Sequence, residues 1–117
     1  MSESAPEFVE LHWTAGSIDE ARLVCRYLVQ EHLVACAQLI PWVESVYMWD
    51  NQLETAQESK VVLKTHVDRV EDVKQAILDN AKYEVPEITV HAILSGNSEY
   101  LDWMRENTMA PPSQTVE

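Results

Sequence analysis

Residues 43–65 read VESVYMWDNQLETAQESKVVLKT, and this stretch decides the fold. Its first arm alternates, with one side carrying Val43, Ser45, Tyr47 and Trp49. Its second arm, residues 57–65, sets Val61, Leu63 and Thr65 against Lys60, Val62 and Lys64. Asp50-Asn51 lies between the arms, and both residue types tolerate the left-handed backbone of a tight turn. The pattern therefore predicts a long β-hairpin.

The segment before this hairpin predicts a strand and a helix. Residues 8–14 alternate, so that Val9, Leu11 and Trp13 face one way and Phe8, Glu10 and His12 the other. Ser17 followed by Glu20 is a capping box that begins a helix. Apolar residues recur behind it at helical spacing, namely Ile18, Ala21, Cys25 and Leu28. Residues 35–40 then begin the first strand of the hairpin, and Pro41 indicates an edge, a bend or a bulge.

The segment after the hairpin predicts a helix, a strand and a short helix. The helix spans residues 67–78 and has an apolar stripe of Val67, Val70, Val73 and Ile77. The strand spans residues 87–94, with one face made of Ile88, Val90, Ala92 and Leu94. Ser98 is expected to cap the last helix, which carries Tyr100, Leu101, Trp103 and Met104.

The order of elements predicts an α+β fold, a ferredoxin-like βαββαβ sandwich with an antiparallel sheet and an extra C-terminal helix. Two helices would cover one face of the sheet. We place a single domain at residues 7–107 and expect residues 1–6 and 108–117 to be flexible termini.

Composition excludes several classes of function. The 117 residues carry a formal net charge of −12, which repels nucleic acid and anionic membranes. The sequence has only two glycines, so a glycine-rich phosphate loop is excluded. No stretch approaches the roughly 18 apolar residues of a membrane helix. Cys25 and Cys36 lack metal-type spacing and predict free thiols in a reducing compartment.

The sheet face away from the two helices is predicted to hold apolar groups. By alternation it carries Phe8, Val62 and Ile93 beside His12, Thr89 and His91, and the hairpin adds Trp42, Tyr47 or Trp49. Apolar groups on an open face favour association, and a long hairpin offers unpaired backbone to another chain. We therefore expect the protein to assemble with copies of itself under closed symmetry.

Five segments, in order, resemble one known family. LVACAQLIP at residues 33–41 is similar to its L-x-A-C-x-x-x-I-P, and SVYMW at 45–49 is similar to S-x-Y-x-W. Glu58 with LKT at 63–65, YEVPEI at 83–88 and YLDW at 100–103 resemble the three later motifs. The chain is thereby identified as resembling the CutA divalent-cation-tolerance family from about Val9 to Trp103.

This resemblance implies a cytoplasmic homotrimer, with sheets inward and helices outward, linked to tolerance of copper and other divalent metals. It does not imply an enzyme. Two positions depart from the family pattern: Ala81-Lys82 stands where His-Pro is usual, and Trp13 stands where several members have Cys. Both changes remove metal donors, so weak copper binding is expected.

The resemblance also implies a cleft between subunits. Six residues at the motif positions are assigned to it: Cys36, Trp49, Glu58, Lys64, Tyr83 and Glu87. They form either a network of hydrogen bonds and ion pairs that fixes the interface or a pocket for a small ligand or cation. Cys36 lies among small apolar residues, which favours packing over reactivity.

A second candidate site comes from the alternation itself. His12 and His91 lie on the same predicted face and could be cross-strand neighbours. Two imidazoles can hold a borderline metal such as copper, although strand histidines are more often structural. The residues by themselves establish no cofactor. Two functions therefore remain: a trimeric metal-homeostasis or signalling module, and a structural assembly protein with no small ligand.

Overall fold

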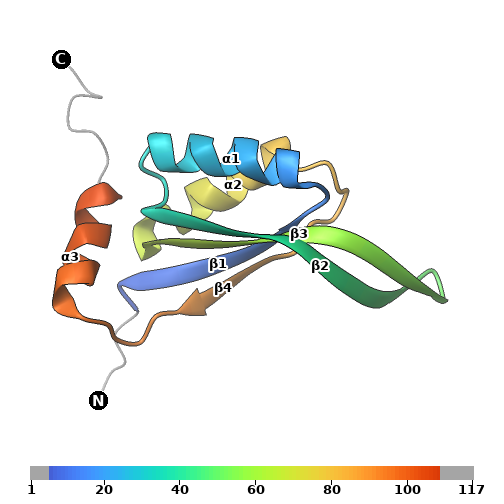
Figure 1. Ribbon diagram of the computed structural model, residues 1–117. Helices are drawn as coiled ribbons and strands as arrows, with labels where there is room; N and C mark the ends of the chain where they lie inside the picture. Colours follow the sequence, from blue (N-terminus) through green and yellow to red (C-terminus); the bar gives the residue numbers. More distant parts are fainter. Residues whose placement is uncertain (1–5, 109–117) are drawn as a thin grey trace.

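The computed structural model describes residues 6–108 and contains one four-stranded antiparallel sheet in the order β2-β3-β1-β4 (Figure 1). The predicted α+β class and βαββαβ order are confirmed. The elements are β1 (Phe8–Ala15), α1 (Ile18–Gln30), β2 (Cys36–Trp49), β3 (Gln52–His66), a 3₁₀ turn (Val67–Arg69), α2 (Val70–Asn80), β4 (Ile88–Ala92) and α3 (Ser98–Asn107).

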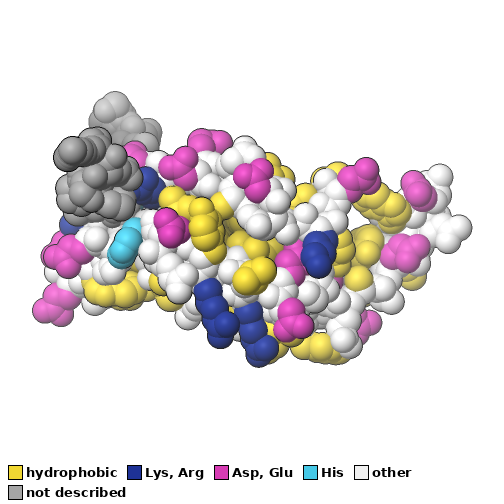
Figure 2. Space-filling model, turned by 90° about the horizontal axis from the view of Figure 1, so that it is seen from above, with side chains coloured by type: hydrophobic (Ala, Val, Ile, Leu, Met, Phe, Trp, Pro, Cys, Tyr) yellow, Lys and Arg dark blue, Asp and Glu magenta, His cyan; other side chains and the backbone are white. Residues whose placement is uncertain are grey.

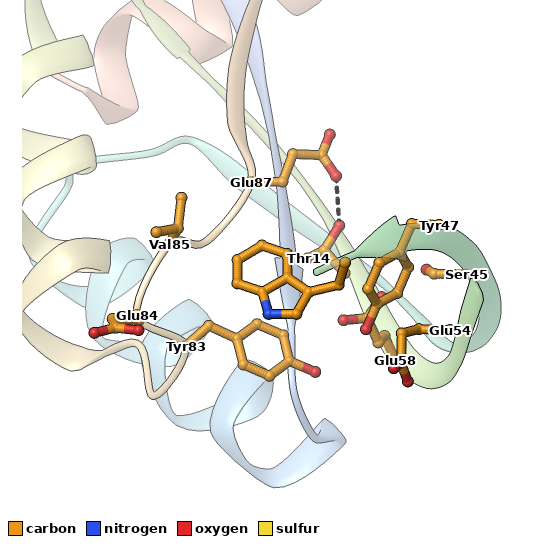
Figure 3. Close-up of a pocket in the computed structure, with 10 residues that line it drawn as sticks. Thr14, Ser45, Tyr47, Glu54, Glu58, Tyr83, Glu84, Val85 and Glu87 are labelled. Carbon is orange, nitrogen blue, oxygen red and sulfur yellow. Dashed lines mark hydrogen bonds between the residues drawn. The ribbon is translucent and has the colours of Figure 1, made fainter. Parts of the chain in front are cut away.

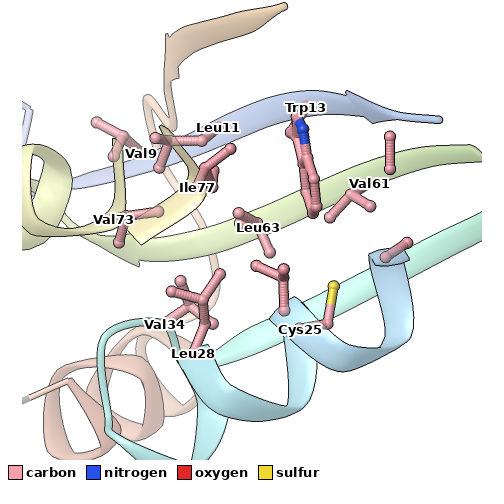
Figure 4. Close-up of a cluster of buried hydrophobic side chains, with 13 residues drawn as sticks. Val9, Leu11, Trp13, Cys25, Leu28, Val34, Val61, Leu63, Val73 and Ile77 are labelled. Carbon is pink, nitrogen blue, oxygen red and sulfur yellow. The ribbon is translucent and has the colours of Figure 1, made fainter. Parts of the chain in front are cut away.

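Helices α1 and α2 lie side by side on one face of the sheet and enclose the main core (Figures 1 and 4). The predicted side of β1, with Val9, Leu11 and Trp13, is buried there against Val61 and Leu63 of β3. Ala21, Cys25 and Leu28 of α1 are buried as expected, and Val24 is buried as well. Ile18 is half-buried, because it lies in the first turn of α1 at the margin of the sheet.

The hairpin of β2 and β3 is longer than predicted and projects past the helices (Figure 1). Its register shifts between Ile40 and Val43, so Pro41 marks a bulge in an edge strand, where the missing N–H costs no ladder bond. Ser59 donates a hydrogen bond from Oγ to the Pro41 carbonyl oxygen at 2.9 Å. Asp50 and Asn51 have φ of 51° and 65°, which confirms the predicted turn.

The C-terminal elements differ from the prediction. β4 spans only Ile88–Ala92, and Leu94, placed in that strand by its alternation, is 93% exposed. The N-cap of α3 is Asn97 rather than Ser98, which is the first helical residue. Alternation cannot show where regular hydrogen bonding stops, and this accounts for both errors.

Helix α3 crosses the end of the sheet opposite the hairpin tip (Figure 1). Met104 of this helix packs against Phe8 and Ala35, and all three are buried. The prediction that Phe8 lies on an uncovered face is therefore wrong, because α3 covers that end.

Thr108, which the sequence placed in a flexible terminus, is also buried. Its Oγ1 donates to the Met104 carbonyl oxygen at 2.8 Å, and its own carbonyl accepts from Arg69. The other residues of the two predicted flexible termini, except Pro6, lie outside the described range.

Acidic side chains are scattered over the helix face and along the hairpin rather than gathered in one patch (Figure 2). Charges spread in this way are typical of a solvated surface. Within residues 6–108, no helix has the length and apolar character needed to cross a membrane.

Candidate functional site

A pocket of about 650 Å³ lies where the hairpin leaves the sheet (Figure 3). One wall belongs to the hairpin and the other to the end of β1 and the loop between α2 and β4. Its lining consists of Thr14, Ser45, Tyr47, Trp49, Glu54, Glu58, Tyr83, Glu84, Val85 and Glu87. A volume of this size is in the range of small-molecule sites, roughly 300–1,000 Å³.

The hairpin wall follows from the pleat. Ser45 pairs with Ala56, Tyr47 with Glu54 and Trp49 with Gln52, so their side chains share one face of the two strands. The alternation predicted for residues 43–49 is thus the feature that lines the pocket. Glu58, opposite Val43, lies on the same face nearer the sheet, where it is 9% exposed.

The loop wall is held by a buried carboxylate of α1. Glu20 accepts a hydrogen bond at Oε2 from the backbone N–H of Lys82 at 3.0 Å, directly before Tyr83. Ser17 caps α1 by accepting from the Glu20 N–H at 3.1 Å, so half of the predicted capping box is confirmed while the Glu20 carboxylate turns to the loop instead. A Cβ at Gly16 would lie 3.3 Å from the Tyr83 ring, so a glycine there lets the tyrosine lie close to the chain.

Two interactions set the electrostatics of the pocket. Partial burial, and after it hydrogen bonding to the Glu58 carboxylate, raise the pKa of Tyr83 to about 12. Glu87 accepts at Oε1 from Thr14 Oγ1 at 2.6 Å (Figure 3), and its Oε2 lies 3.7 Å from Nζ of Lys60. Tyr83 is therefore a hydrogen-bond donor at neutral pH, and Glu87 is held on the wall with a cation beside it.

Four of the six residues assigned to the cleft gather in this pocket: Trp49, Glu58, Tyr83 and Glu87. Cys36 and Lys64 do not. They pair with each other on the sheet under α3, where Nζ of Lys64 is 5.8 Å from the centre of the Tyr100 ring. Burial, followed by interaction with Cys36, raises the pKa of Tyr100 in α3, and the Cys36 thiol is half-buried there.

Sequence reasoning did not assign six of the lining residues to a cleft, namely Thr14, Ser45, Tyr47, Glu54, Glu84 and Val85, and it also missed the cation beside Glu87. Lys60, not Lys64, supplies the cation next to Glu87, because the register pairs Lys60 with Thr14 at the end of β1. Tyr47 was noted as a hairpin residue but not assigned to a cleft. Its place in the alternating run with Trp49 was a signal that could have identified it.

The two histidines are neighbours, as predicted. His91 pairs with Glu10 and His12 with Thr89, and the imidazole centres are 4.2 Å apart. Each ring has another polar partner: Nε2 of His12 is 2.7 Å from Glu10 Oε1, and Nε2 of His91 is 2.9 Å from Thr89 Oγ1. Within residues 6–108, no three His, Cys, Asp or Glu side chains are close enough together to hold a metal ion.

The chain matches known proteins over nearly all of the described range. The profile of the family described as "CutA1 divalent ion tolerance protein" matches residues 9–107. "Divalent-cation tolerance protein CutA" of Thermus thermophilus is 38% identical over 95 residues, which cover 81% of this chain and 92% of that protein. "Protein CutA, chloroplastic" of Arabidopsis thaliana is 29% identical over 92% of this chain, which spans only 58% of that longer protein.

The fold comparison agrees. The solved structure of the divalent cation tolerance protein (Cut A1) from Thermus thermophilus has a TM-score of 0.84 and 35% sequence identity to this chain. The match covers 87% of this chain and 99% of that one. Sequence and fold thus point to the same family, and the family is named for tolerance of divalent ions rather than for a reaction.

Proposed function

The chain belongs to the CutA1 divalent ion tolerance family, and from that premise we propose that it acts as a homotrimeric binding module in divalent-metal tolerance. The proposal places the protein in the cytoplasm and assigns it no catalytic step. The name of the family, which refers to tolerance of divalent ions rather than to a reaction, supports a binding role.

The observation that carries this proposal is the exposed apolar surface of the hairpin. Large apolar side chains are 41–71% exposed along it, namely Trp42, Val46, Tyr47, Met48, Trp49 and Leu53. A two-stranded hairpin is only marginally stable by itself in water. Packing the hairpins of neighbouring subunits together would bury this surface and support the strands, and three copies close a symmetric ring.

Native mass spectrometry and light scattering test the assembly. We expect one species at three times the 13.4 kDa mass of the chain at micromolar concentration. A monomer under these conditions would contradict the proposal. Fractionation of cells that express the full chain tests the cytoplasmic location, for which the two free thiols, Cys25 and Cys36, are the support.

Copper is the metal we propose for this module, bound weakly. Ala81, the C-cap of α2, and Lys82 offer no neutral nitrogen donor next to the pocket. Calorimetric titration of the oligomer with copper should give weak binding, and Ala81→His should tighten it if the pocket takes the metal. Tight binding by the wild type that Ala81→His leaves unchanged would move the site elsewhere.

His12 and His91 are the alternative metal site, because their rings are adjacent and an imidazole nitrogen is a suitable ligand for copper. His12→Asn should then weaken copper binding while Ala81→His has no effect.

The second candidate function is a structural assembly protein with no small ligand, favoured by the same exposed hairpin. An oligomer that keeps its mass and binds neither copper nor any small molecule would support it.

A further inference from the structure

A second cavity, of about 470 Å³, lies on the helix side of the sheet, between α1 and the edge strand β2. Its walls come from residues 18–30 of α1 and residues 37–41 of β2. It shares no lining residue with the pocket beside the hairpin, and its volume is also in the range of small-molecule sites. The assembly proposed above buries other residues, those of the exposed hairpin surface.

The strand wall of this cavity is aliphatic. Ala37 and Leu39 of β2 line it, and both are half-buried against the main core. Cys25 of α1 also lines it and is 3% exposed. Burial raises the pKa of the Cys25 thiol to about 11, so the thiol stays protonated and adds to the apolar wall. Val29, which is 40% exposed, continues this wall toward solvent, and a surface of this kind suits an alkyl chain.

The helix wall carries two arginines. Arg22 and Arg26 lie one turn apart on α1, so their side chains are neighbours, and Gln30 follows one turn further along the same row. Both arginines are exposed, and no ion pair or side-chain hydrogen bond among residues 6–108 includes either of them.

The sign of the charge at this cavity is opposite to that of the chain. The sequence has 8 basic residues against 20 acidic ones, yet the lining described for this cavity contains two arginines and no acid. A guanidinium group presents its N–H donors as a planar fork that matches the two oxygens of a carboxylate. The cavity therefore favours an anion, and its helix wall favours a planar one.

Neither wall is enough by itself. An ion pair at an exposed arginine contributes little in water, and an alkyl chain without a charged end has no preferred orientation on an apolar wall. A molecule that carries both groups makes both contacts while it loses its translational freedom only once. The combination thus selects a ligand that has a charged head and an apolar body.

We propose that the cavity between α1 and β2 binds a small amphipathic carboxylate, with its head group at Arg22 and Arg26 and its alkyl chain along Leu39 and Val29. This inference goes beyond the proposed function, because it assigns a second ligand site and requires neither a metal nor the pocket beside the hairpin. All of its residues belong to one chain, so each subunit holds one site in any state of assembly.

Three probes separate the two parts of the ligand. Octanoate has both, octan-1-ol has the chain without the charge, and acetate has the charge without the chain. Calorimetry on the native full chain at low salt should show one octanoate per subunit, with the other two probes weaker by about tenfold or more. Octan-1-ol or acetate binding as tightly as octanoate, or no saturable binding of octanoate, would overturn the proposal.

One pair of variants tests the charged wall. Arg26→Gln removes a guanidinium group from the cavity and should weaken octanoate binding severalfold. Lys82→Gln is the matched control, because Lys82 is also exposed, lies outside the cavity and loses the same charge. Equal weakening by the two changes would show that only the net charge of the chain matters, and the site would be refuted.

A second pair tests the apolar wall. Val29→Asp sets a carboxylate against the alkyl chain and should weaken octanoate binding by about tenfold or more, whereas Leu23→Asp should retain most of the binding. Both positions are exposed on α1, so both variants should fold, and only Val29 lines the cavity. Equal binding by these two variants would place octanoate elsewhere and contradict the inference.

Subunit mass followed in parallel separates this inference from the proposed assembly. A monomer that binds octanoate at this site would refute the trimer and keep the carboxylate site. A trimer that binds no octanoate would do the reverse. Octanoate binding that appears only after the oligomer is dissociated would show that a second copy covers the cavity, and would overturn the proposal.

Discussion

Glu20 and Tyr83 show how single residues build the pocket. Glu20 is 8% exposed at the start of α1, and its carboxylate accepts from the Lys82 N–H of a loop 62 positions along the chain. That bond holds the backbone next to Tyr83, whose ring fits against Gly16. One buried acid in the first turn of α1 thus holds the loop wall of the pocket, because a carboxylate is a strong acceptor for a backbone N–H.

Tyr83 should make the stability of the fold fall in alkali. Its pKa is raised to about 12 in the folded protein, against 10.0 for a free tyrosine. The unfolded chain therefore releases this proton first, so the free energy of unfolding falls as pH rises from about 10 to about 12. Urea unfolding across this range should show a shallower decline for Tyr83→Phe than for the wild type.

Tyr27→Phe is the matched control, since Tyr27 is 49% exposed on α1 and lies outside the pocket. Its stability profile should follow that of the wild type. Ultraviolet titration of tyrosinate should also show the loss of one late-titrating group in Tyr83→Phe. A Tyr83→Phe profile identical to the wild type would show that the Tyr83 proton is not held by the fold.

The hairpin is the element on which the pocket depends, because strands β2 and β3 carry its aromatic wall beyond the edge of the core. Its register is set by the turn at one end and the Pro41 bulge at the other. A slip of one residue would send Tyr47 and Trp49 to the opposite face of the hairpin. The strand register therefore depends more on the turn here than it does in a hairpin whose side chains pack on a core.

Asn51→Val tests this dependence. Asn51 has φ of 65°, where a β-branched residue is disfavoured by roughly 1–2 kcal/mol. We expect Asn51→Val to lower the free energy of unfolding by about that amount and to speed amide exchange near the hairpin tip. Asn51→Gly tolerates the same φ and should stay within about 0.5 kcal/mol of the wild type. Equal stability of the two variants would show that the tip does not need its left-handed turn.

At the scale of the whole molecule, Trp49 links the pocket to the proposed assembly. It is 57% exposed in the single chain and lies directly before the turn. Docking the part of the side chain that is still exposed would bury on the order of 110 Å², which at about 25 cal/mol per Å² is up to about 3 kcal/mol per contact before ordering costs. Trp49→Ala should therefore weaken the oligomer far more than the fold of one subunit.

Unfolding at several protein concentrations, with subunit mass measured in parallel, checks this expectation. The midpoint for Trp49→Ala should depend more strongly on concentration than that of the wild type. Leu23→Ala is the control, because Leu23 is 72% exposed on α1, away from the hairpin. A Trp49→Ala protein that stays fully assembled at nanomolar concentration, with an unchanged midpoint, would show that Trp49 is not an interface anchor.

Most of the fold could be predicted because its signals are local. Alternation identified β1 and both arms of the hairpin, Ser17 marked the start of α1, and Asp50-Asn51 marked the turn. The candidate site could be predicted only in part. Trp49, Glu58, Tyr83 and Glu87 line one pocket of the single chain, whereas Lys64 and Cys36 lie under α3.

The sequence by itself determined the order of elements, the two faces of each strand and the acidic surface, because periodicity and turn chemistry act between residues close in the chain. Only the tertiary structure decided that α3 covers Phe8, that Thr108 is buried, and that Lys60 rather than Lys64 lies beside Glu87. These contacts join residues that are far apart in the chain or follow from strand register. Such contacts depend on how complete elements pack, and no local pattern carries that information.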